Sequence, residues 1–242
     1  MQSGRTSRGG RGRTRAPVTR DLALRAAAGL ADRDGLASLS MRKLAGKLGI
    51  EAMSLYHHVK NKDDLLDGMV DLVFSEINLP VAGQDWQAVL QDRAESTRTA
   101  LTRHPWAISI MDSRTSPGPA TLRHQDAAIG CLRGAGFSIA MAAHAMSLID
   151  SYVHGFVLQE VSLPLDDTGD IAAATQDILQ QQPMLSNAFP HLAEMAAQLI
   201  LQPGYAYSNE FPFGLRIILR GLEAALVEAG EVPPRTLDMY PS

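Results

Sequence analysis

The chain has 242 residues, 45% of them hydrophobic, and a formal net charge of −4, so it can bury one or two substantial cores. It contains no long uncharged apolar run and a single cysteine, Cys131, which excludes a membrane-spanning helix and an internal disulfide. The arginine-rich first residues lack the apolar segment of a secretory signal, so we expect a protein of the reducing cytoplasm.

The charges are divided unevenly along the chain. Residues 1–62 hold 13 basic and 4 acidic side chains, a balance of +9, whereas residues 63–242 hold 9 basic and 22 acidic ones, a balance of −13. A positive N-terminal part attracts phosphates, and an acidic remainder discourages non-specific wrapping along DNA. The distribution therefore favours a nucleic-acid-binding head on a separate regulatory body.

Residues 1–17 contain five arginines among glycine, serine and threonine, a composition that cannot form a core. We expect a disordered basic arm, which is either a solvated tail or a contact to phosphates or the minor groove. A first helix should follow, capped by Thr19 and ended by Gly35. Its apolar stripe consists of Ala23, Ala26, Ala27 and Leu30.

Residues 40–62 predict two short helices joined by a tight turn. Ser40 can cap the first helix, and Gly49 can end it in a left-handed conformation. A second helix is expected from about Ala52 to Val59, with Leu55 and Val59 turned inward. Its outward side chains are polar, aromatic or soft, and they can reach a base edge or a phosphate. This pattern is typical of a helix-turn-helix that reads the major groove.

Two stretches in this region carry a family resemblance: residues 48–50, Leu-Gly-Ile, and residues 55–66, Leu-Tyr-His-His-Val-Lys-Asn-Lys-Asp-Asp-Leu-Leu. They closely resemble the DNA-binding domain of the TetR family of bacterial repressors, and the resemblance covers about residues 19–77. By position in that reading unit, the groove contacts are expected from Arg42, Met53, Ser54, Tyr56 and His57, and the phosphate anchors from Ser40, His58, Lys60 and Lys62. Tyr56 suits either part, and Lys62 is alternatively a solvated charge.

The remaining pattern is helical to the end, which predicts an all-α protein. We expect an N-terminal three-helix helix-turn-helix domain at 18–62, a connecting helix at 63–80 and a larger helical ligand-binding and dimerisation domain at 84–230. Asn61 can cap the connecting helix with Asp64 in a loose capping box. The body helices are expected at about 86–101, 106–111, 120–135, 138–160, 171–181, 191–201 and 211–229, with loops at 113–119 and 164–170.

The helices at 138–160 and 211–229 carry more apolar surface than one solvent-facing stripe needs, so each is fully buried or forms half of an interface. Residues 211–223 also resemble the closing helix of TetR-family effector domains. That resemblance implies a four-helix bundle between two copies. The homodimer would present two recognition helices to a pseudo-palindromic operator on double-stranded DNA.

In this family the ligand lies inside the body. Polar or soft residues that interrupt the apolar faces there are the candidates: Arg93, Thr97, Met111, Arg114, His144, Asp150, His154 and Gln159. Asp150 and His154 share a helix face, where they hold either a ligand or a plain intrahelical hydrogen bond. In rough alignment, Met111 and Gln159 replace a metal-binding histidine and a ligand-shell glutamate of the tetracycline-binding members. We therefore expect a different, mainly apolar small molecule.

The leading hypothesis is a ligand-responsive transcriptional repressor that a small-molecule effector releases from DNA. No Gly-rich phosphate loop, nucleophile elbow or paired catalytic carboxylates point to an enzyme, and no Cys/His spacing predicts a metal or cofactor site. Two alternatives remain open: a ligand-independent DNA-coating protein, and a helical enzyme with an accessory DNA-binding head.

Overall fold

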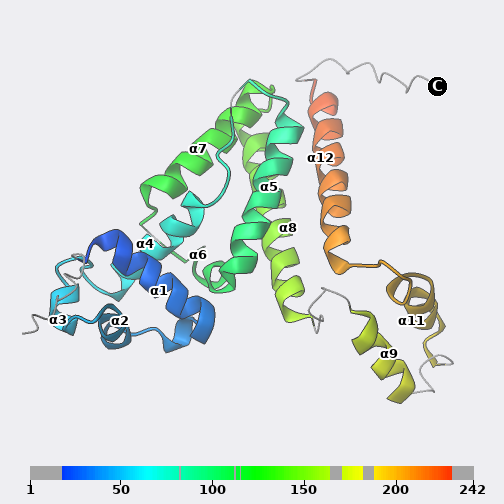
Figure 1. Ribbon diagram of the computed structural model, residues 1–242. Coiled ribbons are helices and arrows are strands. Elements are labelled where there is room, and N and C mark those ends of the chain that lie inside the picture. The colour runs from blue at the N-terminus through cyan, green and yellow to red at the C-terminus, as the bar shows by residue number, and fades with distance from the viewer. Residues whose placement is uncertain are drawn as a thin grey trace, which may run out of the picture.

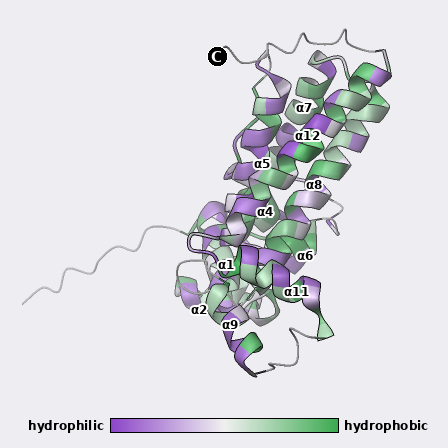
Figure 2. Ribbon diagram, turned by 90° about the vertical axis from the view of Figure 1, so that its right-hand side faces the viewer, coloured by the Kyte–Doolittle hydropathy of each residue, from purple (hydrophilic) through white to green (hydrophobic). Residues whose placement is uncertain are grey.

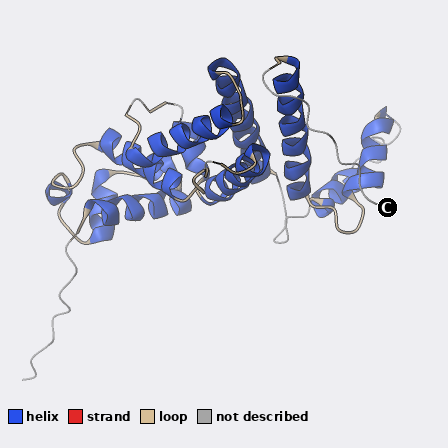
Figure 3. Ribbon diagram, turned by 90° about the horizontal axis from the view of Figure 1, so that it is seen from above, coloured by secondary structure: helices blue, strands red, loops and turns tan. Residues whose placement is uncertain are grey.

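The computed structural model describes residues 18–81, 83–111, 113–114, 116–163, 171–181 and 188–230. Within these ranges every regular element is a helix or helical turn, and no strand occurs (Figures 1 and 3). The all-α prediction is confirmed. The basic arm predicted at 1–17 and the loop predicted at 164–170 lie outside the described residues.

The head begins with three helices: α1 (Arg20–Asp34), α2 (Met41–Leu48) and α3 (Ala52–Leu55), with a 3-10 turn at Leu36–Ser38. The Oγ1 of Thr19 accepts from the backbone N of Leu22 at 3.2 Å, and the Oγ of Ser40 accepts from the backbone N of Lys43 at 3.2 Å. Gly49 ends α2 with φ 66° and ψ 38°, a left-handed conformation that suits glycine. The local signals of the sequence therefore form the turn as predicted.

The second helix of the reading unit is shorter than expected, because α3 ends at Leu55 instead of reaching Val59. The chain continues as a tight turn, in which the backbone N of His58 donates to the carbonyl of Leu55 at 2.9 Å. Aromatic and β-branched residues have modest helix propensity, which weakens the helix here. In addition, the carbonyl of His58 accepts from Arg20 Nη1 at 3.1 Å, so a tertiary contact uses this oxygen.

The connecting helix α4 spans Lys62–Ser75, so it begins and ends before the predicted 63–80. Asn61 caps it as expected, its Oδ1 accepting from the backbone N of Asp64 at 2.8 Å. Asp64 does not complete the capping box on Asn61, because its Oδ2 accepts from the backbone N of Lys60 at 2.7 Å instead. One face of α4 is buried throughout and packs on both α1 and α7, so this helix belongs to the head and to the body.

The body is a bundle of helices built on α5, α7, α8 and α12 (Figure 1). Its elements are α5 (Trp86–Arg103), a 3-10 turn (Pro105–Ala107), α6 (Ile108–Met111), α7 (Pro119–Gly134), α8 (Ile139–Ser162) and α12 (Glu210–Glu228). A single cluster of buried hydrophobic residues runs from α1 to α12, so head and body share one continuous core. No helix in the described part of the chain is both long and apolar enough to cross a membrane.

Two further helices, α9 (Ala172–Gln181) and α11 (Pro190–Met195), lie beyond α12, outside the bundle (Figures 1 and 3). A π-helical turn at Ala196–Ile200 and a 3-10 turn at Tyr207–Asn209 lead back to α12. On the apolar face of residues 190–200, Leu192 remains 60% exposed, and Ala196 is the buried member. This face therefore does not contribute to the core that the bundle buries.

Candidate DNA-reading face and effector cavity

The reading unit presents most of its predicted contact residues to solvent. Leu55 and Val59 are buried as expected, whereas Met53 is 74% and Tyr56 45% exposed. Ser40, Arg42, Ser54, His57, Lys60 and Lys62 are also exposed, and His58 is half-buried. Ser40 already uses its hydroxyl oxygen as the cap of α2, and Lys62 is the first residue of α4. All nine predicted contact residues therefore lie within residues 40–62, and eight of them are exposed.

Arg20, which sequence reasoning missed, holds this segment in place. Its Nη2 and Nη1 donate to the two carboxylate oxygens of Asp64 at 2.7 and 3.0 Å, in a bidentate pair. The same guanidinium donates to the carbonyls of His58 and Asp64 at 3.1 and 3.3 Å. The Arg20 side chain thus connects the start of α1 to the start of α4 and to the turn after α3, residues 56–60, which we call the reading turn.

We call the Arg20 contacts to Asp64 and to the His58 carbonyl the Arg20 clamp. The ion pair in this clamp stabilises the charged forms of both Arg20 and Asp64. The hydrogen bond from Arg20, supported by the backbone N of Lys60, lowers the pKa of the Asp64 carboxyl. The same carboxylate raises the pKa of Arg20. No signal within three or four residues marks Arg20 as functional, because its partner lies 44 positions away.

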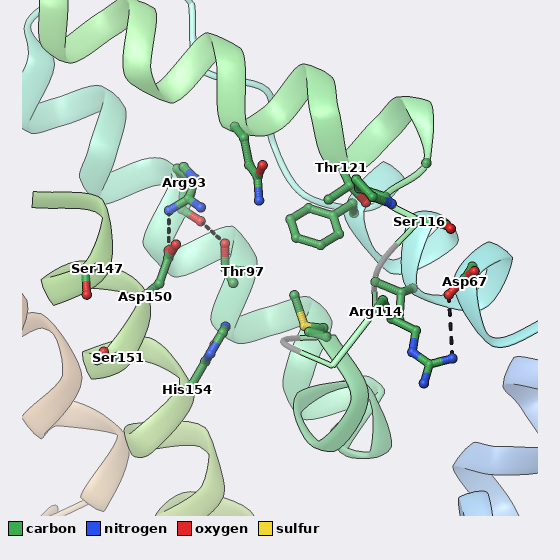
Figure 4. Close-up of a pocket in the computed structure, with 16 residues that line it drawn as sticks. Asp67, Arg93, Thr97, Arg114, Ser116, Thr121, Ser147, Asp150, Ser151 and His154 are labelled. Carbon is green, nitrogen blue, oxygen red and sulfur yellow. Dashed lines mark hydrogen bonds and ion pairs between the residues drawn. The ribbon is translucent and has the colours of Figure 1, made fainter. Parts of the chain in front are cut away.

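A cavity of about 500 Å³ lies between α4 and the body (Figure 4). Helices α4, α5, α6, α7 and α8 and the segment before α7 contribute its lining: Asp67, Val70, Phe74, Arg93, Thr97, Met111, Arg114, Ser116, Pro117, Gly118, Thr121, Gln125, Ser147, Asp150, Ser151 and His154. Eleven of these sixteen residues are polar or charged. The expectation of a mainly apolar ligand therefore does not match the lining.

A partly buried ion pair crosses one wall of the cavity. Arg93 Nη1 donates to Asp150 Oδ1 at 2.8 Å, and the two side chains point toward each other in Figure 4. The Arg93 side chain is 5% exposed and that of Asp150 34%. Asp150 therefore pairs with Arg93 rather than forming the intrahelical bond to His154 that the sequence left open. Arg93 Nε is buried and has no hydrogen-bond partner among the described residues.

Six of the eight predicted effector contacts line this cavity: Arg93, Thr97, Met111, Arg114, Asp150 and His154. The other two do not. His144 is exposed elsewhere on α8, and the amide oxygen of Gln159 accepts from the hydroxyl of Tyr207 at 2.7 Å. These two candidates therefore lie outside this cavity.

Sequence reasoning missed further lining residues on α8, although a signal for them exists. Ser147 and Ser151 join Asp150 and His154 as a polar stripe at i, i+3, i+4 and i+7 on an otherwise apolar helix. Such a stripe lies on one face of a helix. The lining residues of α4 and α7 carry no comparable pattern.

The cavity wall includes the helix that carries the head. Asp67, Val70 and Phe74 of α4 line the cavity together with the start of α7. There, Asp71 of α4 accepts from the backbone N and the hydroxyl of Thr121 at 2.8 and 3.1 Å. Helix α4 therefore forms part of the cavity wall and is hydrogen-bonded to the start of α7.

His124 lies behind this wall, with its ring centroid 6.1 Å from that of Phe74. It is buried, and its Nδ1 has no hydrogen-bond partner among the described residues. Burial, helped by the charge of Arg93, lowers the pKa of His124. The ring therefore favours the neutral form in the folded protein.

A helix-turn-helix with an exposed reading face, joined by one helix to a hollow helical body, defines the class of small-molecule-responsive DNA-binding regulators. The sequence matches the family described as "Bacterial regulatory proteins, tetR family" over residues 23–69 and "Tetracyclin repressor-like, C-terminal domain" over residues 79–226. The chain belongs to the TetR family.

Individual relatives agree with this assignment. An HTH-type transcriptional regulator of Saccharopolyspora erythraea is 37% identical, covering 74% of this chain and 78% of its own length. The HTH-type transcriptional repressor DrrR1 of Streptomyces coeruleorubidus is 31% identical, covering 90% and 82% respectively. The structure of the TetR family protein ActR of Streptomyces coelicolor in complex with actinorhodin has a TM-score of 0.70 at 29% identity, covering 87% of this chain and 99% of ActR.

The protein is accordingly a ligand-responsive transcriptional repressor that binds a pseudo-palindromic operator as a homodimer and is released by a small molecule. The predicted family, fold class and function are confirmed. The roles of individual residues and the identity of the effector are separate questions.

Proposed function

We propose that the effector binds in the cavity between α4 and the body and releases the operator by moving α4. The observation that carries this proposal is the double role of α4. Its residues Asp67, Val70 and Phe74 line the cavity, and its first turn holds Asp64, which anchors the reading turn. A ligand that fits only one pose of α4 shifts the equilibrium between poses by the difference in its affinities.

On the DNA side, the proposed base contacts are Arg42, Met53, Ser54, Tyr56 and His57, and the proposed phosphate anchors are Ser40, His58, Lys60 and Lys62. The exposure of these side chains supports this assignment, as does the positive charge of the head. Arginine suits a bidentate contact to guanine, and a thioether suits the methyl group of thymine.

The proposed homodimer interface is the outer face of α8 and α12, which pack side by side. Hydrophobic positions recur along α8 in Figure 2. On this pair of helices, Leu148, Leu158, Phe213 and Ile217 are between 48% and 55% exposed. Such large apolar side chains on neighbouring helices are typical of a surface covered by a partner.

The lining indicates the chemistry of the effector. Arg93 Nε and Arg114 Nε are buried donors without a partner among the described residues, and several hydroxyl groups face the cavity. Phe74 and Met111 supply apolar surface. We therefore propose an effector with several acceptor oxygens on an apolar or aromatic frame. Actinorhodin, the compound bound in the ActR structure, is a sensible first probe.

The test is fluorescence anisotropy with DNA flanking the gene, with and without actinorhodin and a panel of related compounds. Ser151→Trp should fill the cavity and reduce release by an active compound at least tenfold, which is about 1.4 kcal/mol. Ser162→Trp, on the last turn of the same helix but outside the cavity lining, is the matched control. Equal loss in both variants would contradict the cavity as the effector site.

The same assay separates the alternatives. A DNA-coating protein binds every duplex alike and is not released by any compound, whereas an accessory-head enzyme consumes a compound. The relatives are transcriptional regulators. We propose that this chain likewise has no catalytic activity and acts in the cytoplasm.

A further inference from the structure

A polar cluster lies where α1 meets the body. His104 and Trp106 are buried, and both bind the carboxylate of Asp32 on α1. The Nδ1 of His104 lies 2.7 Å from Asp32 Oδ1, and the Nε1 of Trp106 donates to the same oxygen at 2.6 Å. Since a carboxylate oxygen only accepts, Nδ1 carries the proton in this contact.

The cluster also includes the end of α4. Glu76, the residue after α4, has its Oε2 3.3 Å from the Nε2 of His104 and 2.6 Å from Arg103 Nη1. The local sequence explains this convergence, because Pro105 ends α5 and starts the 3-10 turn that places Trp106 beside His104. One histidine thus lies between carboxylates of two different head helices.

Helix α1 is therefore held at both ends. Arg20, at its start, binds the reading turn through the carbonyl of His58, and Asp32, in its last turn, binds the body. The twelve residue steps from Arg20 to Asp32 rise by about 18 Å. A tilt of about 10° at the Asp32 end moves the Arg20 end by about 3 Å, close to the 3.4 Å rise of one base pair.

We propose that Asp32, His104 and Trp106 are positioning residues that make α1 a strut between body and reading turn, and that this strut sets which spacing of operator half-sites the dimer accepts. The inference rests on the proposed reading face, since the strut acts by aiming it. A stiff junction penalises a misplaced half-site, whereas a loose junction lets each head follow the DNA.

The test uses the full-length dimer and an operator selected from random duplexes by the wild-type protein. Affinity is measured for this operator and for a copy with one base pair inserted between the half-sites. For the wild type we expect the insertion to weaken binding about tenfold or more. Asp32→Asn removes the carboxylate charge that His104 and Trp106 bind, and Trp106→Phe removes the indole N–H donor. For both variants we expect the insertion to cause a loss of about threefold or less.

Asp21→Asn is the matched control, because it makes the same change on the same helix in an exposed i,i+4 pair with Arg25. For Asp21→Asn, the ratio of the affinities for the two operators should equal that of the wild type. The ratio does not depend on the fraction of active protein, so partial unfolding does not imitate the effect. Wild-type ratios in both Asp32→Asn and Trp106→Phe would overturn the strut, whereas a wild type that selects no operator would overturn the proposed reading face itself.

Discussion

The head and the body of this repressor are stabilised by polar contacts of different range. In the head, Thr19, Ser40 and Asn61 each cap a helix through a backbone N–H three residues ahead. In the body, Arg93 pairs with Asp150 across 57 positions, and Arg98 pairs with Glu160 across 62. The head depends mainly on local signals, with Arg20 and Asp32 as its long-range exceptions. The body adds contacts between distant helices to its own local caps at Asp85 and Ser138.

This difference matches the work of each part. A reading unit needs a rigid exposed surface, and local caps provide rigidity while using only one of the proposed contact side chains, Ser40. A ligand site needs polar groups inside a core, and these groups must be paired by partners on other helices. Damage to the body should therefore cost stability, while damage to the reading face should cost only DNA affinity.

The largest effect is expected from Asp150→Ala, which leaves Arg93 buried without its partner. Removing one member of such a pair should lower the free energy of unfolding by about 3 kcal/mol. Urea denaturation followed by circular dichroism measures this loss. The double variant Arg93→Met, Asp150→Leu removes both charges and should recover most of it, and a double variant as unstable as Asp150→Ala would count against the ion-pair explanation.

Arg42→Ala should lower the affinity for DNA and leave the stability of the fold unchanged. We expect a loss of about 2 kcal/mol in operator affinity, from one base contact, with a free energy of unfolding unchanged within about 0.5 kcal/mol. Fluorescence anisotropy on the selected operator measures the affinity. Arg25→Ala is the matched control, since this exposed arginine of α1 pairs with Asp21 away from the reading turn. Similar losses of operator affinity in the two variants would mean that Arg42 contributes only its positive charge and makes no base contact.

Asn61→Ala tests the local caps. It removes the bond to the backbone N of Asp64 and should lower the free energy of unfolding by about 1 kcal/mol. Asn209→Ala is the comparison, because Asn209 precedes α12 but its side chain makes no cap bond there. Thermal or urea denaturation should show a change of only a few tenths of a kcal/mol for that variant. The opposite order would contradict the assignment of the caps.

The smallest effect is a pH dependence that arises in the body. Burial lowers the pKa of His124 from its ordinary value of 6.5, so the unfolded chain binds this proton first as the pH falls. The free energy of unfolding should therefore decline below about pH 6.5. Urea denaturation at several pH values should give a flatter profile for His124→Gln. His191→Gln, at an exposed histidine of α11, should keep the wild-type profile.

Much of the fold was predictable from residues three or four positions apart. The caps Thr19, Ser40 and Asn61 and the turn at Gly49 all form where the sequence predicts them. Hydrogen bonds and apolar stripes of a helix are local, so their signals survive without knowledge of the neighbours. For the same reason, four cavity-lining residues, Arg93, Thr97, Asp150 and His154, are predictable as polar interruptions on helix faces.

The tertiary structure decided what those helices do to one another. Arg20 reaches Asp64 and the carbonyl of His58, and Asp32 reaches His104 and Trp106 over more than seventy positions. Packing in three dimensions alone brings such groups together, so the sequence determined the helices and their faces while the fold determined the cavity, the clamp and the strut.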